Sequence, residues 1–259
     1  MKGSDRASAW LFPPDSVTWR VGREAALLLG GGRALLLQLA HPGVAAGVAE
    51  HSDFRTRPLS RLLRTLSLTL SLSFGTRAQA LEAARAINRT HERVQGEGYS
   101  ATDPRLLLWV HATLINGVFV TCDAFVRKLE REEREAYYAE AQTLGTLLGI
   151  PARVYPTDLR GFEEYLEGML SVGSGASDLE VDERARTLAA AVLHPPMPLG
   201  ATFLPVPAIT AGLLPPRLRE TYGLRWGRTE RAAFAATRAL TPRLLPVLPR
   251  RLRYLRPPG

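Results

Sequence analysis

The sequence predicts an all-α protein built as a single multi-helix domain. Apolar residues recur at helical spacing along most of the chain, and prolines and glycines fall between these runs. No internal repeat and no proline- or serine-rich linker divides the 259 residues, a length that suits one large domain. We therefore expect one helical domain over residues 1–240, followed by a basic, proline-rich tail over residues 241–259.

The first candidate helix spans Trp19–Leu39, and Gly30–Gly32 would either kink it or split it. After His41-Pro42 comes GVAAGVAEHS, whose small residues would allow close approach of a neighbouring element or of a flat ligand. The next candidate helix is Leu59–Phe74. Its segment LSLTLSLSF alternates as a strand would, but it continues a helical run and is not enriched in β-branched residues, so we predict a helix.

A third helix is expected over Gln79–Gly96, and it carries a histidine on its apolar stripe. This stripe comprises Leu81, Ala84, Ile87, His91 and Val94. A histidine that points into a core needs a partner for each ring nitrogen, or a metal on one of them. His91 is therefore either a structural residue bonded to a backbone carbonyl or a metal ligand.

The rest of the chain continues the helical pattern. Asp103 and Pro104 read as an N-cap and a first helical residue for Arg105–Lys128, which contains His111. Further helices are expected at Glu130–Leu148, from Thr157 or Asp158 to about Met169, and at Val181–Leu193, Ile209–Leu214, Arg217–Tyr222 and Thr229–Leu240.

Composition excludes several classes of protein. The net charge is +8, but the arginines are spread among carboxylates without a nucleic-acid-binding motif, so we expect no nucleic-acid partner. A single cysteine, Cys122, rules out an internal disulfide and a thiolate metal cluster. Together with the lack of an apolar N-terminal signal, this predicts a cytoplasmic protein.

No standard catalytic motif is present. The five histidines form no HExxH and no two-histidine, one-carboxylate spacing, and the chain has neither a glycine-rich phosphate loop nor a GxSxG elbow. What remains are polar residues on otherwise apolar helices, namely Gln38, His41, Arg61, Arg64, Thr65, His91 and His111.

Arg61, Arg64 and Thr65 share one helical face by their spacing. If that face is buried, its arginines need an anion. The anion is either an internal carboxylate such as Asp53 or Glu50, or the carboxylate of a cofactor or an anionic intermediate.

Taken together, these motifs resemble one oxygenase superfamily over nearly the whole chain. RALLLQLAHPGVAAGVAEHSDF is followed by P-x-x-R-x-x-R-T, FGT and H-x-x-V-x-G-x-G-Y-x-A-x-D-P-x-LL-x-WVHATL, and then by LLGIP, PPMP and AGLLPPRLRETYGL. The string is similar to the short bacterial branch of the superfamily that contains the rubber oxygenases (latex-clearing proteins) and the fungal MpaB-type oxygenases of mycophenolic acid biosynthesis.

The resemblance implies an all-helical fold with a globin-like core that holds haem b. The family's H-x-x-V context selects His91 as the axial ligand of the iron, and its Arg-x-x-Lys-Thr pattern falls on Arg61, Arg64 and Thr65. Arg64 replaces the lysine, and a guanidinium cannot deprotonate to bind iron. His111 in WVHATL is the rival ligand, and Glu50 is the nearest candidate for the family's catalytic glutamate.

The resemblance further implies an oxidoreductase, a haem-b-dependent oxygenase that uses dioxygen on an apolar, isoprenoid-like substrate. The alternative is a non-catalytic haem or small-ligand binding protein, a carrier or sensor on the same fold. No C-x-x-C-H motif is present, so haem b is expected to bind non-covalently.

The tail offers a further partner. It interleaves arginines with leucines and contains no carboxylate, a composition that can lie on an anionic membrane surface. The alternative is that its leucines cover an apolar groove of the helical domain, because its prolines prevent a long amphipathic helix.

Overall fold

The computed structural model describes residues 9–52, 58–171, 177–194 and 206–256. The all-α prediction is confirmed: within these ranges the only sheet is a small antiparallel hairpin of β1 (Gln95–Gly96) and β2 (Tyr99–Ser100). No strand was expected in this part of the sequence.

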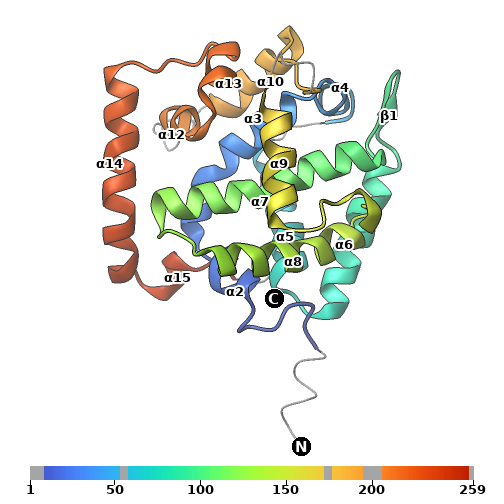
Figure 1. Cartoon of the computed structure of the whole chain (residues 1–259), viewed down its shortest axis with the longest axis horizontal. Coiled ribbons are helices and arrows are strands. Elements are labelled where there is room, and N and C mark those ends of the chain that lie inside the picture. The colour runs from blue at the N-terminus through green and yellow to red at the C-terminus, as the bar shows by residue number, and fades with distance from the viewer. Residues whose placement is uncertain (1–8, 53–57, 172–176, 195–205, 257–259) are drawn as a thin grey trace, which may run out of the picture.

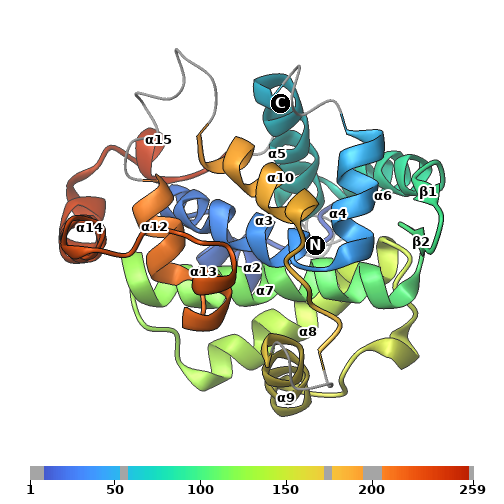
Figure 2. The same ribbon diagram turned by 90° about the horizontal axis from the view of Figure 1, so that it is seen from above.

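The central element is α7 (Pro104–Phe125), which crosses the middle of the molecule in both views (Figures 1 and 2). The side chain of Asp103 accepts a hydrogen bond from the Arg105 N–H, so the predicted N-cap is confirmed. By length and composition α7 could cross a membrane, but 61% of its apolar window is buried inside the bundle. Burial on several sides makes it the core helix, and Trp109 in its N-terminal half is 0% exposed.

The expected helix Trp19–Leu39 consists of three pieces, α2 (Val17–Gly22), η1 (Ala25–Gly30) and α3 (Gly31–Leu39). The chain breaks at Glu24, whose backbone is extended, and the boundary between η1 and α3 falls at Gly30 and Gly31, among the glycines expected to kink or split the helix. Gly30 and Gly32 also allow close packing: a Cβ atom on either would lie within about 2.1 Å of a threonine Oγ1 on α7 or α12.

The small residues of α4 (Pro42–His51) are contacted by a neighbouring element. Cβ atoms built at Gly43 and Gly47 would each lie 3.3 Å from the side chain of Tyr99, which belongs to β2. His41 caps this helix, because its Nδ1 accepts a hydrogen bond from the Gly43 N–H at 3.2 Å.

The next two helices, α5 (Pro58–Phe74) and α6 (Arg77–His91), form an antiparallel hairpin around Gly75 and Thr76. The LSLTLSLSF segment is helical, as predicted. Thr76 and Gln79 start α6 with a capping box, in which each side chain accepts a hydrogen bond from the other's backbone N–H. The expected end at Gly96 is wrong: α6 ends at His91, because β1 begins four residues later.

Shorter helices surround α7. They are α8 (Arg131–Leu147), η2 (Ala152–Val154), α9 (Leu159–Leu170), α10 (Glu183–Leu193), α12 (Val206–Leu213) and α13 (Pro216–Thr221).

The C-terminal segment comprises α14 (Arg228–Leu244), η3 (Leu245–Val247) and α15 (Arg250–Arg253). α14 lies at the rim of the molecule in both views, and none of its residues is buried (Figures 1 and 2). It runs without interruption past Leu240 and contains Pro242, so residue 240 falls inside a helix.

Candidate functional site

Four of the predicted site residues, Arg61, Arg64, Thr65 and His91, lie on the two helices of the α5–α6 hairpin. Arg61 lies 13 residues before the end of α5, and Thr90 lies 13 residues after the start of α6, so the two are level along the hairpin. By the same count, His91 at the end of α6 and the residues Arg61, Arg64 and Thr65 of α5 all lie toward the helix ends that are remote from the connecting turn.

His91 is half-buried, and its Nδ1 atom is shielded from solvent. Among the described residues this nitrogen has no hydrogen-bond partner, so no backbone carbonyl accepts from it there. Burial lowers the pKa of His91 below its ordinary value, because a charged ring would lose its hydration. The ring is thus held neutral, which is the form that binds a metal.

Asn88 lies one turn before His91 on α6 and was not identified from the sequence. Its Nδ2 donates to the backbone carbonyl of Leu147 at 3.0 Å, which fixes the amide against the last turn of α8. Its Oδ1 is buried and, within the described part of the chain, has no partner. Asn88 Oδ1 and His91 Nδ1 are therefore two buried, unpaired atoms one turn apart on α6. The only signal for this pair in the sequence was an amide residue three positions before a core-facing histidine.

The expectation of a buried face on α5 is wrong for two of its three residues. Arg64 and Thr65 are both exposed, and so is Leu63, at 55%. The described side chains of α5 that pack inward include Leu68, Leu72 and Phe74, nearer its C-terminal end. The side chain of Arg61 lies outside the described part of the structure.

His111 lies inside the bundle and is 7% exposed. Its Nδ1 is 2.7 Å from the hydroxyl of Tyr155. Burial lowers the pKa of His111 to about 4 and raises that of Tyr155, so both are neutral at pH 7. Gly145 of α8 makes room for the pair: a Cβ atom there would lie 1.4 Å from the Tyr155 hydroxyl and 3.0 Å from Nδ1 of His111.

Glu50 belongs to a different network. Its carboxylate accepts a hydrogen bond from the Tyr99 hydroxyl at 2.6 Å and faces Arg184 at 3.6 Å. These contacts join α4 to the β-hairpin and to α10 and do not involve the α5–α6 hairpin. The other candidate carboxylate, Asp53, lies outside the described residues.

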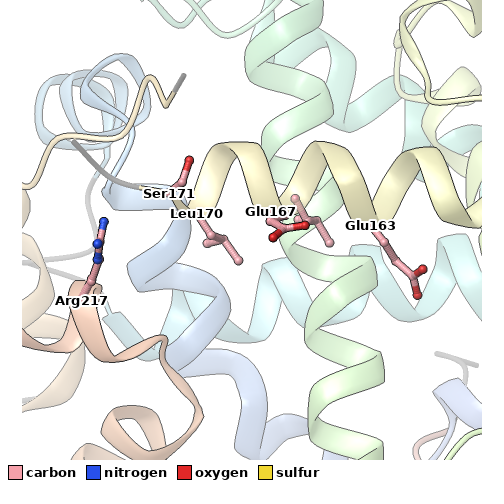
Figure 3. A pocket seen from close by; sticks show the side chains of 6 residues that line it. Glu163, Glu167, Leu170, Ser171 and Arg217 are labelled. Atoms are coloured by element: carbon pink, nitrogen blue, oxygen red, sulfur yellow. The ribbon is translucent and has the colours of Figure 1, made fainter. Parts of the chain in front are cut away.

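The other features of the described residues are weaker candidates for a functional site. A shallow groove of about 620 Å³ runs along α9 beside Arg217 of α13, and Figure 3 shows Glu163 and Glu167 along this helix. None of the predicted site residues lines it. No group of three or more histidine, cysteine, aspartate or glutamate side chains that could hold a metal ion occurs among the described residues.

Comparison with known proteins identifies the family. The chain matches the family model described as "ER-bound oxygenase mpaB/B'/Rubber oxygenase, catalytic domain" over residues 19–243. It is 29% identical over 225 residues to an uncharacterized protein of Mycobacterium bovis and, to the same extent, to an uncharacterized protein of Mycobacterium tuberculosis. Each alignment covers 82% of this chain and 87% of the relative. No solved structure matches significantly. The chain belongs to this family of oxygenase catalytic domains.

Proposed function

We propose that this member of the mpaB/rubber oxygenase family is a haem-b-dependent oxygenase that uses dioxygen on an apolar, isoprenoid-like substrate, with His91 as the protein ligand of the iron. The observation that carries the proposal is the neutral imidazole of His91, whose Nδ1 is buried and, among the described residues, unpaired.

A single protein ligand suits haem. The macrocycle supplies four nitrogens, so a haem iron needs only an axial side chain such as a proximal histidine. A metal bound by the protein alone would need at least three side chains, and the described residues contain no such group. His91 therefore fits a haem better than it fits a bare metal ion.

Asn88 would orient the ligand. A metal-bound histidine almost always donates its second ring N–H to an acceptor, which fixes the ring and the tautomer. The unpaired Oδ1 of Asn88 is an acceptor one turn before His91, and the Nδ2 bond to Leu147 holds this amide against α8. A bond from Nδ1–H to this oxygen would leave Nε2 for the iron and would satisfy both unpaired atoms.

The α5 turn would supply positive charge and hydrogen-bond donors. Haem b, when bound, supplies the iron at which dioxygen is activated. Arg61 and Thr65 would donate hydrogen bonds toward negative charge that develops on the reacting oxygen, which lowers the barrier. Arg64 can add positive charge, but it cannot bind the iron, because a guanidinium cannot deprotonate to become a ligand.

Apolar surface beside this turn supports an apolar substrate. Leu63 is adjacent to Arg64 in sequence and is 55% exposed. An exposed leucine beside the proposed donors would contact the hydrocarbon part of a substrate, and removing that contact from water favours binding.

An absorption spectrum of the purified protein after reconstitution with hemin tests the proposal. A shifted Soret band, and binding of carbon monoxide to the reduced form, are expected of a haem enzyme with one open iron position. A spectrum of six-coordinate iron with two protein ligands would favour the carrier or sensor instead. Absence of any Soret shift would contradict haem binding altogether.

A further inference from the structure

The C-terminal segment carries a group of large apolar side chains that are exposed in the described part of the structure. Five of the nine large apolar side chains that are exposed in the described residues fall within residues 240–252. We call this surface, comprising Leu240, Leu244, Val247, Leu248 and Leu252, the tail face. Its exposed fractions range from 38% at Leu248 to 75% at Val247, so the expectation that these side chains cover a groove of the domain is wrong for this set.

The segment that carries the tail face is anchored to the domain. Arg253 pairs with Glu24 at 2.8 Å, and the Leu255 N–H donates to the backbone carbonyl of Arg23 at 2.8 Å. Leu245 points inward and is 5% exposed. These inward contacts use the side chains of Leu245 and Arg253 and the backbone of Leu255, and they leave the side chains of the tail face exposed.

Arginines interleave with the tail face. Arg243, Arg250 and Arg251 are all exposed, and residues 231–259 contain no aspartate or glutamate. Although Arg253 pairs with Glu24, the exposed arginines leave the segment positively charged, so a complementary occupant is both apolar and anionic. A second copy docked through the same face would place arginines against arginines, which is unfavourable.

We propose that the tail face docks this domain on an anionic lipid surface. A protein partner is a poorer fit, because the hot spots of protein–protein interfaces are typically Trp, Tyr and Arg, with Leu and Val under-represented. Residues 240–252 contain no aromatic residue and supply aliphatic side chains. Leucines that enter the acyl boundary, with arginines at the level of acidic headgroups, are the composition of an interfacial segment. Figure 1 shows α14 and α15 together at one edge of the molecule, where a flat surface can reach them.

Vesicle flotation of the full-length protein tests the proposal. The probes are vesicles of phosphatidylcholine alone and vesicles that are one third phosphatidylglycerol. We expect flotation with the anionic vesicles, weakening as salt is added, because screening removes the attraction of the headgroups.

Two double variants separate the charged and apolar contributions. Arg250→Ala with Arg251→Ala should lower partitioning to anionic vesicles about 25-fold, or about fivefold for each arginine. Leu244→Ser with Leu248→Ser should lower it at least about tenfold, because less apolar surface is buried. The matched controls are Arg153→Ala with Arg160→Ala, exposed arginines on η2 and α9, and Leu114→Ser, an exposed leucine on α7. Both controls should float like the wild type.

Three outcomes would overturn the proposal. These are no flotation of the wild type, equal flotation of the tail variants and the wild type, or a gel-filtration dimer that the leucine variant converts to monomer. The last result would assign the tail face to a second copy of the chain. None of these measurements depends on haem or on turnover, so they succeed or fail independently of the proposed oxygenase function.

Discussion

The helix turn that ends at His91 and the ring of His111 both contact the last turn of α8, and the surroundings of the two histidines differ. Asn88, one turn before His91, bonds to Leu147 of that turn, while His111 abuts Gly145 within it. The Nδ1 of His111 has a hydroxyl partner at 2.7 Å, and the Nδ1 of His91 has none among the described residues.

If His91 is the iron ligand, as proposed, burial alone does not distinguish a ligand histidine from a core histidine. His111 is the more buried of the two, yet its neighbours satisfy Nδ1 and enclose the ring as a core residue. An unpaired buried polar atom costs about 1–3 kcal/mol in the folded state. At His91 the proposed bond from Nδ1–H to Asn88 would remove this cost, and at His111 the Tyr155 hydroxyl already removes it.

The largest expected effect is loss of haem from His91→Ala. Removing the axial imidazole deletes the protein's bond to iron, so the Soret shift on hemin addition should disappear while far-ultraviolet circular dichroism retains most of the helix signal. His111→Ala is the matched control and should still bind hemin. The opposite pattern would transfer the ligand role to His111.

Arg61→Ala and Thr65→Ala should each retain haem but slow oxygen chemistry by about 10²–10³, the scale for losing one preorganised donor. Oxygen consumption with any accepted substrate measures this effect. Arg85→Ala, an exposed arginine on the middle of α6, serves as the control. Unchanged turnover in Arg61→Ala would make Arg61 a structural ion-pair residue, and loss of folding would lead to the same conclusion.

The pH dependence of stability should report on His111. Its pKa is about 4 when folded, against an ordinary value of 6.5, so the unfolded chain binds the proton more readily. The stability is fully present above pH 6.5 and falls as the pH drops toward 4, by about 3 kcal/mol in total.

Urea unfolding at several pH values in this window measures the His111 effect. The pKa of His91 is also lowered, so His91 adds to the slope in the same direction. His111→Gln should flatten much of the slope. A variant that keeps the wild-type slope would show that His111 is not the group responsible.

A smaller effect is expected from Asn88→Ala, which removes the acceptor proposed for Nδ1–H of His91. Affinity for hemin should fall about 10–100-fold, the range for second-sphere partners of metal-bound histidine, and the reduction potential of the bound haem should shift. Asn88→Asp keeps an acceptor oxygen and should lie closer to the wild type. If Asn88→Ala and the wild type had the same affinity for hemin and the same reduction potential, the only role left for Asn88 would be its hydrogen bond to Leu147 of α8.

Local signals in the sequence predicted most of the fold. Asp103-Pro104 marked the start of α7, and Thr76, although unrecognised as a cap, follows the glycine that closes α5. The break at Glu24 was missed because its cause is distant in sequence: its carboxylate pairs with Arg253, 229 residues away. Helix periodicity cannot encode such a contact.

The candidate site could be predicted only in part. The family motif and the stripe of α6 identified His91, but the unpaired state of its Nδ1 depends on neighbours from other helices. Asn88 bonds to Leu147, 59 residues away, and His111 lies against Tyr155, 44 residues away. The exposure of Arg64 and Thr65 was not predicted, because spacing gives the shared face and not its burial.

Chemical rescue tests the central claim most directly. His91→Gly and His111→Gly are each mixed with hemin, and free imidazole is then added while the Soret band is followed. The account predicts that His91→Gly binds hemin only when imidazole replaces the missing ring, and that His111→Gly binds hemin without it. Rescue of His111→Gly by imidazole, with His91→Gly binding hemin unaided, would contradict the assignment of His91 as the iron ligand.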